Sequence, residues 1–159
     1  MYEDISDVQK VLWEPSLDAF LAPFSTNVAG VYFTSIAFLH LLHAGNKKCL
    51  RSLLAVLKFV VMSSIAGYSK HIQSSIAYSA SKAAATHLAK NLATYFTNLH
   101  IRVNVLGPGL YPSEMTGASE SDETGYISMA GKQILWGDVP AQRPGMERET
   151  GGLGMFMAR

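Results

Sequence analysis

The chain has 159 residues, 48% of them hydrophobic, which is enough for a single domain with a hydrophobic core and excludes a wholly disordered protein. Its 13 basic and 12 acidic residues leave a net charge of +1, so the charge balance gives no sign of a nucleic-acid-binding protein. The single cysteine, Cys49, excludes an internal disulfide. The acidic start MYEDISDVQK argues against a secretory signal, and the most apolar window, LLAVLKFVVM, is shorter than the roughly 20 residues that span a bilayer. We therefore expect a soluble cytoplasmic protein that binds neither membrane nor nucleic acid.

The first predicted helix follows a polar amino-terminal segment, residues 1–15. Ser16 is a plausible N-cap, and the apolar stretch after it is predicted to be helical as far as Gly45, because glycine commonly ends helices. Pro23 lies inside this stretch and predicts a kink or a break into two helices. The polar residues 46–52 are expected to form a solvated link.

Two short apolar runs on either side of a long helix are expected to be strands. The run LKFVVM is β-branched and apolar, which predicts a buried strand, and the loop SSIAG follows it. Residues 74–100 have the strongest helical pattern in the chain, and the second strand, IRVNVLG, is stopped by a Pro-Gly pair. One face of the long helix is expected to carry Ala77, Ala84, Leu88, Leu92 and Tyr95.

The last third of the chain is predicted to be loop followed by a helix. Residues 110–145 are rich in Gly, Ser, Pro and acidic residues, which predicts loop with one or two helical turns. Residues 147–158 form a final helix candidate, although its three glycines each weaken it by roughly 1 kcal/mol relative to alanine. The order strand, helix, strand, helix indicates a parallel α/β sheet, of which only two strands are convincing.

The long helix carries a tyrosine and a lysine, Tyr78 and Lys82, whose spacing places both side chains on one helical face. A lysine ammonium beside a phenol favours the phenolate and lowers the pKa of tyrosine from its reference value of about 10. A tyrosine tuned in this way can pass a proton to or from a carbinol oxygen. Such pairs also arise by chance, and the alternative is an exposed helical pair without a chemical role.

Polar residues elsewhere offer one further candidate for the proton-transfer site and one candidate metal site, which we set aside. Ser64 follows the first strand, and open parallel sheets bind ligands at the carboxyl ends of their strands. Its hydroxyl could hold the same substrate oxygen, or it could simply satisfy a turn. His40 and His43 lie three residues apart on the first helix, but a metal site would need further converging ligands, so we expect no metal there.

Taken together, these segments resemble the short-chain dehydrogenase/reductase family over about residues 13–158. SSIAG and AYSASKAA resemble its active-site region, and TNVAGVYFTS resembles the preceding helix, where an asparagine completes a Ser-Tyr-Lys-Asn tetrad. IRVNVLGPGLYPSEMT resembles the next strand with the Pro-Gly turn beside the nicotinamide, and VPAQRPGMERETGGLGMFMA resembles a late helix. Four signatures in the family's order are far more specific than one motif.

The resemblance implies a catalytic set made of Asn27, Ser64, Tyr78 and Lys82. Tyr78 would be the general acid/base, and Lys82 would lower its pKa and bind the nicotinamide ribose. Ser64 would steady the substrate oxygen, with Ser63 as a less favoured substitute. Asn27 would hold a water that links Lys82 to solvent, unless it is a buried helical asparagine bonded to the backbone.

The resemblance also implies an NAD(P) cofactor, without indicating which of NAD and NADP is preferred. Thr116 would contact the nicotinamide carboxamide or the phosphates. Ser113 is a weaker candidate for the phosphates and could equally be a plain turn serine. The residues that would contact the cofactor are Tyr78, Lys82, Pro108, Gly109, Leu110, Ser113 and Thr116.

The fold implied is a partial Rossmann-like domain, an α/β doubly wound parallel sheet. Residues 16–159 would be its carboxyl-terminal catalytic portion, a single domain with only the fifth and sixth of the family's seven strands. The glycine-rich turn T-G-x-x-x-G-x-G, which binds the dinucleotide in this family, does not occur in the sequence. Because hydride transfer needs that cofactor, we do not expect this chain to be active alone.

Two functions follow as expectations. The first is an NAD(P)-dependent oxidoreductase that interconverts a carbonyl and an alcohol on a small molecule, with a loop that weakly resembles those of 3-oxoacyl-carrier-protein reductases. The alternative is a non-catalytic remnant that forms a homodimer, or a mixed dimer with a complete relative, through its two long helices. Both helices carry small residues that allow close approach: Gly30, Ser35, Ala80 and Ala84. A truncated gene product without an independent role is a third possibility.

Overall fold

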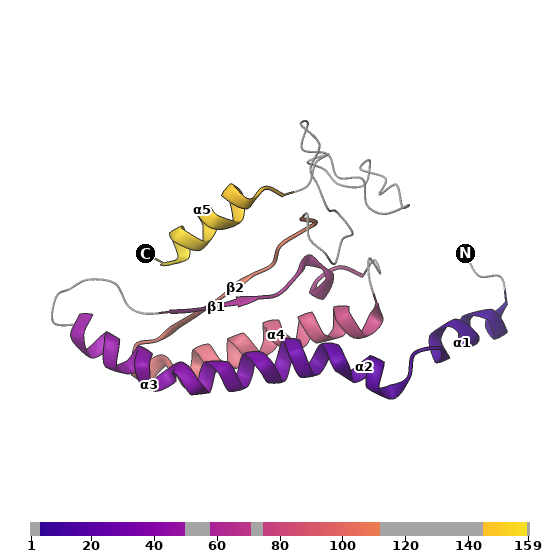
Figure 1. The fold of residues 1–159 in the computed structure, drawn as a ribbon, viewed down its shortest axis with the longest axis horizontal. Helices are drawn as coiled ribbons and strands as arrows, with labels where there is room; N and C mark the ends of the chain where they lie inside the picture. The colour runs from indigo at the N-terminus through magenta and orange to yellow at the C-terminus, as the bar shows by residue number, and fades with distance from the viewer. Residues whose placement is uncertain (1–3, 50–57, 71–74, 112–144, 159) are drawn as a thin grey trace.

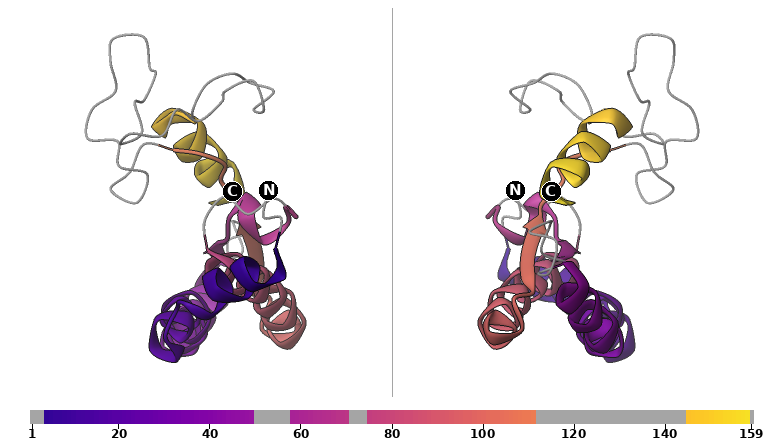
Figure 2. Two further views of the ribbon diagram at one scale, coloured as in Figure 1. Left: turned by 90° about the vertical axis from the view of Figure 1, so that its right-hand side faces the viewer. Right: turned by 90° about the vertical axis from the view of Figure 1, so that its left-hand side faces the viewer.

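A computed structural model describes residues 4–49, 58–70, 75–111 and 145–158 of the chain. Among these residues the sheet has two strands, β1 (Lys58–Met62) and β2 (Arg102–Leu106), which run parallel with Val61 opposite Val105. The long helices α3 (Val31–Cys49) and α4 (Ile76–Tyr95) lie on one side of the strands, and α5 (Glu147–Ala158) lies on the other (Figures 1 and 2). Both strands and α5 confirm the elements predicted from the sequence.

The first long helix does not break at Pro23. Ser16 caps α2 (Leu17–Phe24) through its hydroxyl, which accepts a hydrogen bond from the Ala19 amide at 3.2 Å, as predicted. A π-helical turn, η1 (Ser25–Gly30), follows α2 directly and leads into α3. Proline lacks the backbone amide that would donate a helical hydrogen bond, and a π-helical turn can accommodate this loss. The helix therefore continues without a break.

This helix also passes through Gly45, which we had predicted to be its end. It continues to Cys49, so the expected link at 46–52 begins with helix; residues 50–52 lie outside the described residues. Asn46 is buried and donates a hydrogen bond to the His100 carbonyl at 2.8 Å. This contact with a distant segment holds the helix end in place, which glycine propensity alone does not reveal.

Helix α4 packs through a face that differs in part from the predicted one. Ser75 caps it, and its buried residues include Ala77 and Leu92, as expected. Tyr95, however, is 82% exposed, and Phe96 takes its place in a core cluster with Leu92 and Ile101. The buried face also includes the polar residues Ser81 and Thr86.

Two segments differ from the sequence analysis in other ways. A short helix, α1 (Ile5–Trp13), occupies much of the segment described above only as polar, and Asp4 caps it. Strand β1 is less buried than predicted, with Val60 39% and Met62 47% exposed. The physical reason is that no strand lies on its other side among the described residues. The predicted loop at 110–145 lies almost wholly outside the described residues.

The helical stretch Leu17–Lys48 is long and apolar enough, by length and composition, to cross a membrane. In the sequence we considered only the shorter window LLAVLKFVVM and did not identify this stretch. Core helices of soluble proteins, which are mostly buried, and signal sequences near the amino terminus pass the same test; in this stretch only 6% of the apolar window is buried. Here α2 and η1 pack against α4, and α3 touches β1. The cytoplasmic location expected from the sequence stays a prediction.

Candidate active site

Three elements bring the predicted catalytic residues to one region. Ser64 follows β1 and caps a single 3-10 turn, η3 (Ile65–Gly67), while Tyr78 and Lys82 lie on α4. The turn packs closely on the helix: a Cβ at Gly67 would lie 2.8 Å from the Ala83 nitrogen and 2.9 Å from the Lys82 carbonyl carbon. Only glycine permits this approach, which brings the Ser64 turn against the Tyr78 helix.

Lys82 lies beside Tyr78, as the helical spacing predicts. Its Nζ is 5.6 Å from the centroid of the Tyr78 ring and donates a hydrogen bond to the Met62 carbonyl at 3.0 Å. Both side chains are half-buried. Burial lowers the pKa of Lys82 below its ordinary value of 10.5, because the charged form loses solvation. The ammonium therefore lies near the Tyr78 ring and is bonded to the end of β1.

The two adjacent serines have different environments. Ser63 is only 4% exposed, and its hydroxyl lies 3.0 Å from the Lys82 carbonyl, to which it donates, and 2.7 Å from the Thr86 hydroxyl. Ser64 is half-buried, and its hydroxyl oxygen accepts a hydrogen bond from the Ala66 amide at 3.2 Å. That contact leaves the Ser64 proton available to another acceptor, whereas Ser63 is used in packing the strand end against α4.

Asn27 lies in the π-helical turn and reaches across to α4. Its Nδ2 donates to the Ser81 hydroxyl at 3.0 Å, and Ser81 donates to the Tyr78 carbonyl at 2.8 Å. Asn27 is thus bonded to a side chain, unlike the backbone-bonded asparagine that we weighed as an alternative. Ser81 is fully buried and was missed in the sequence analysis, although it stands directly before Lys82 in the SASK motif.

The turn after β2 is tied to the same region. The Pro108 carbonyl accepts from the Ile65 amide at 3.0 Å, which links this turn to η3. The Leu110 carbonyl accepts from the Gly145 amide at 2.9 Å, just before α5. Pro108 and Gly109 thus lie next to the Ser64 turn, and Leu110 is bonded to Gly145, just before α5. The other two predicted cofactor contacts, Ser113 and Thr116, lie outside the described residues.

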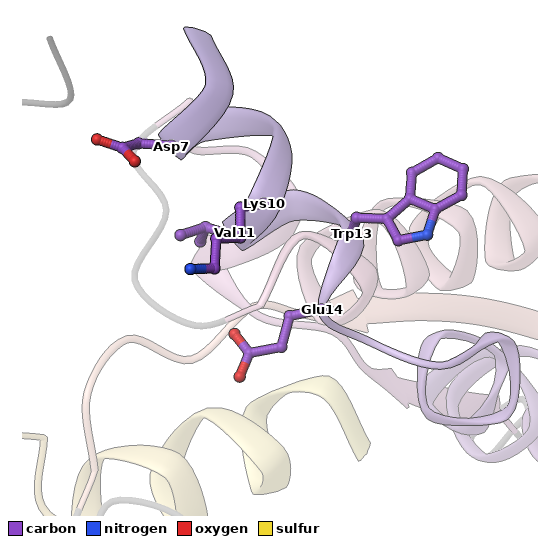
Figure 3. A pocket seen from close by; sticks show the side chains of 5 residues that line it. All are labelled: Asp7, Lys10, Val11, Trp13 and Glu14. Atoms are coloured by element: carbon purple, nitrogen blue, oxygen red, sulfur yellow. The ribbon is translucent and has the colours of Figure 1, made fainter. Parts of the chain in front are cut away.

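A hollow of about 500 Å³ opens beside these residues. It lies between η1 with the start of α3 on one side and β1 on the other, and both Asn27 and Lys82 line it. A larger hollow, about 680 Å³, lies on the exposed side of α1 and is lined by Asp7, Lys10, Val11, Trp13 and Glu14. Figure 3 shows that these five side chains point in different directions, so they form no convergent site.

The described part of the chain contains no group of three or more His, Cys, Asp and Glu residues that could hold a metal ion. His40 and His43 therefore have no third ligand of these types there.

The residue pattern of the short chain dehydrogenase family matches residues 6–124, which contain all four candidate catalytic residues. The chain therefore belongs to the short-chain dehydrogenase family, as its motifs predicted. Among curated relatives, the short-chain dehydrogenase/reductase PhomF′ of Diaporthe leptostromiformis is 45% identical over 112 residues, which are 70% of this chain and 38% of PhomF′. The short-chain dehydrogenase/reductase SAT3 of Stachybotrys chartarum is 36% identical over 154 residues, 90% of this chain and 56% of SAT3.

Solved structures agree with this assignment. The Pseudomonas aeruginosa RhlG/NADP active-site complex matches with a TM-score of 0.71 and 28% identity, over 92% of this chain and 53% of RhlG. A short-chain type dehydrogenase/reductase from Mycobacterium marinum matches with a TM-score of 0.72 and 27% identity, over 91% of this chain and 51% of its own. The predicted fold, part of a Rossmann-like α/β domain, is confirmed. The chain spans about half the length of the relatives that it matches.

Proposed function

We propose that this chain supplies the proton-handling half of an NAD(P)-dependent oxidoreductase that interconverts a carbonyl and an alcohol. The observation that carries the proposal is the Lys82 ammonium, 5.6 Å from the centroid of the Tyr78 ring on the helix face against which the Ser64 turn packs. A phenol, an ammonium and a free hydroxyl proton in one region are what proton transfer to a substrate oxygen requires. Family membership supports the same reading.

Each residue then has a defined task. Tyr78 gives its proton to the substrate oxygen or takes it back, and Lys82 places a positive charge beside its ring. Ser64 donates a hydrogen bond to the same oxygen, while Ser63 keeps its structural contacts with α4. Asn27 faces the hollow that also contains Lys82 and can hold a water there.

The residues present could bind only one end of the cofactor. Lys82 and the turn at Pro108, Gly109 and Leu110 can contact the nicotinamide end, and a nicotinamide dinucleotide supplies or accepts the hydride in this family. The glycine-rich turn that binds the phosphates is not in the sequence. We therefore propose that catalysis needs residues beyond these 159, and the relatives solved with NADP or NAD support a nicotinamide cofactor for the whole enzyme.

The test is to fuse this chain to the amino-terminal half of PhomF′ and to measure NADPH- and NADH-dependent reduction. A 3-oxoacyl thioester is a sensible first substrate, because a Pseudomonas aeruginosa 3-oxoacyl-[acyl-carrier-protein] reductase is 33% identical over 104 residues. We expect Tyr78→Phe to lower turnover at least roughly 100-fold and Ser64→Ala to lower it less. Tyr95→Phe is the matched control, since Tyr95 lies exposed on the same helix. Equal turnover in Tyr78→Phe and the unmutated fusion would refute the role of Tyr78.

A second candidate, association without catalysis, has its own support. The helix from α2 to α3 leaves a row of large apolar side chains in solvent: Leu17, Phe20, Leu21, Phe33, Ile36, Phe38 and Leu41. Apolar surfaces of this extent commonly mark protein contacts. A homodimer, or a mixed dimer with a complete relative, would cover them. Light scattering that shows a stable monomer, alone and with such a relative, would count against this function.

A further inference from the structure

Two basic side chains stand at the amino ends of the two strands and have no role in the site described above. Lys58 begins β1 and Arg102 begins β2, and the register of the sheet places the two residues directly opposite each other. Opposite residues of paired strands lie on the same face, and like charges in this position repel. Loss of solvation and, secondly, the charge of Arg102 lower the pKa of Lys58. The two cations therefore lie close enough to destabilise each other.

A third polar residue, Asn104, lies on the same face of the sheet. Phe59 and Val103 pack against the core cluster that lies between the strands and the long helices. Because successive side chains of a strand point to opposite faces, Lys58, Arg102 and Asn104 point away from that cluster. They point to the side of the sheet on which α5 lies (Figure 2). One face thus gathers an ammonium, a guanidinium and an amide.

Two of the donors on this face are buried without an acceptor. Neither the Lys58 ammonium nitrogen nor the Asn104 side-chain nitrogen has a hydrogen-bond partner among the described residues. Buried polar groups are nearly always hydrogen-bonded, and an unpaired donor is most costly when it is charged. What is missing is therefore an acceptor, and the repulsion between Lys58 and Arg102 indicates that this acceptor carries negative charge.

A hollow of about 390 Å³ beside β2 provides room for such a ligand. Arg102, Asn104 and His100 contribute to its lining, which contains no acidic residue. A guanidinium can bind two oxygens of one oxyanion, and an ammonium on a flexible stem adds a compact charge. Two cations match a phosphate group, which carries a charge of about −1.5 to −2 near pH 7, better than they match the single charge of a carboxylate.

We infer that the amino ends of β1 and β2 form a binding site for the phosphate group of a small anion. Lys58 and Arg102 neutralise the phosphate charge, and the Asn104 side chain donates a hydrogen bond to one of its oxygens. The site begins at the opposite end of β1 from Ser64, which follows the carboxyl end of that strand. It is therefore separate from the residues of the proposed proton transfer.

The experiment titrates inorganic phosphate into the complete 159-residue chain and follows the side-chain amide of Asn104 by NMR. We expect a saturable shift that sodium chloride at equal ionic strength does not reproduce. Lys58→Met and Arg102→Gln should each weaken phosphate binding at least roughly tenfold, because each removes a charged donor. Lys90→Gln is the matched control, since Lys90 is exposed on α4, and it should leave binding unchanged.

Two further ligands define the class of anion. Phenyl phosphate that binds more tightly than inorganic phosphate would assign the site to a phosphate ester, and weaker binding would assign it to free phosphate; both results support the inference. Sodium acetate that binds as tightly as phosphate would overturn it in favour of a carboxylate.

The inference is also overturned if phosphate causes no saturable shift, if sodium chloride causes the same shift, or if Lys58→Met binds phosphate as the unmutated chain does. Without phosphate, Lys58→Met should unfold at no lower urea concentration than the unmutated chain, because it removes a repulsion. A lower midpoint would instead assign Lys58 a structural role. The titration of the unmutated chain needs no variant and no turnover, so its failure is distinguishable from failure of the proposed function.

Discussion

At the scale of single residues, burial separates side chains that look equivalent in the sequence. Ser63 and Ser64 are neighbours of the same type. The Ser63 hydroxyl bonds to Lys82 and Thr86, whereas the Ser64 hydroxyl accepts from the Ala66 amide and has no acceptor of its own among the described residues. In the same way, Ser81 connects Asn27 to the backbone of Tyr78. The residues that hold a site in place are thus recognised by their contacts and not by their type.

Ser81→Ala tests this connection. It leaves the Asn27 amide and the Tyr78 carbonyl without their buried partner, so we expect a loss of about 1–3 kcal/mol in the free energy of unfolding. We also expect the Asn27 side-chain amide to exchange faster with solvent, measured by NMR. Ser79→Ala is the matched control on the same helix, because the buried Ser79 hydroxyl has no hydrogen-bond partner. An unchanged Asn27 amide in Ser81→Ala would contradict the connection.

Lys82 gives the protein a pH dependence of defined sign. Burial lowers the pKa of Lys82 in the folded state below 10.5, so the unfolded chain binds more protons between the two pKa values. Stability from this residue therefore rises as the pH rises through that window and is lost as the pH falls through the folded-state pKa. In urea unfolding at a series of pH values just below 10.5, we expect stability to rise more steeply with pH in the unmutated chain than in Lys82→Met. Equal slopes would show that Lys82 titrates alike in both states.

At the scale of elements, contacts between distant segments set the helix ends. Helix α3 continues past Gly45 because Asn46 meets the carbonyls of Leu99 and His100 at the connection between α4 and β2. His100 adopts a positive φ of 54° at this connection, which ends η4 (Thr97–Leu99) and directs the chain into β2. One asparagine thus fastens α3 to the connection between α4 and β2.

Asn46→Ala should therefore destabilise the chain more than an ordinary surface change. The variant leaves two carbonyls without their buried donor, and we expect a loss of about 1–3 kcal/mol in urea unfolding. Asn98→Ala, at an exposed position of η4, should change the free energy of unfolding by less than about 0.5 kcal/mol. Similar losses in the two variants would argue against the anchoring role of Asn46.

At the scale of the whole molecule, the chain exposes many large apolar side chains. Among the described residues the two-stranded sheet has two open edges, and the long helix exposes several large apolar side chains. Isolated two-stranded sheets are marginally stable in water. Association, whether with a second copy or with a complementary half, is the direct way to cover these surfaces.

Phe33→Glu tests association through the helix. Phe33 is 68% exposed on α3, and a charge there should shift the chain towards monomer in light scattering over a range of concentrations. Phe156→Glu is the matched control, because Phe156 is 73% exposed on α5, on the other side of the sheet. If both variants associate as the unmutated chain does, this helix face is not the contact.

The elements themselves were largely predictable because their signals are local. Alternation and β-branching located both strands to within a residue or two, and Ser16 caps its helix as its side chain predicts. The helix end at Gly45 and the orientation of Tyr95 were wrong, since both depend on what packs nearby. The short helix α1 was missed because residues 1–15 were taken only as polar.

The sequence by itself determined the family, the parallel order of the elements and the helical face shared by Tyr78 and Lys82, because spacing along a helix or strand fixes these features locally. Only the tertiary structure decided which serine is buried, that Lys82 contacts the end of β1, and that Ser81 holds Asn27. These contacts join residues that are separated along the chain by at least one other element. They therefore depend on how the elements pack, which no local pattern specifies.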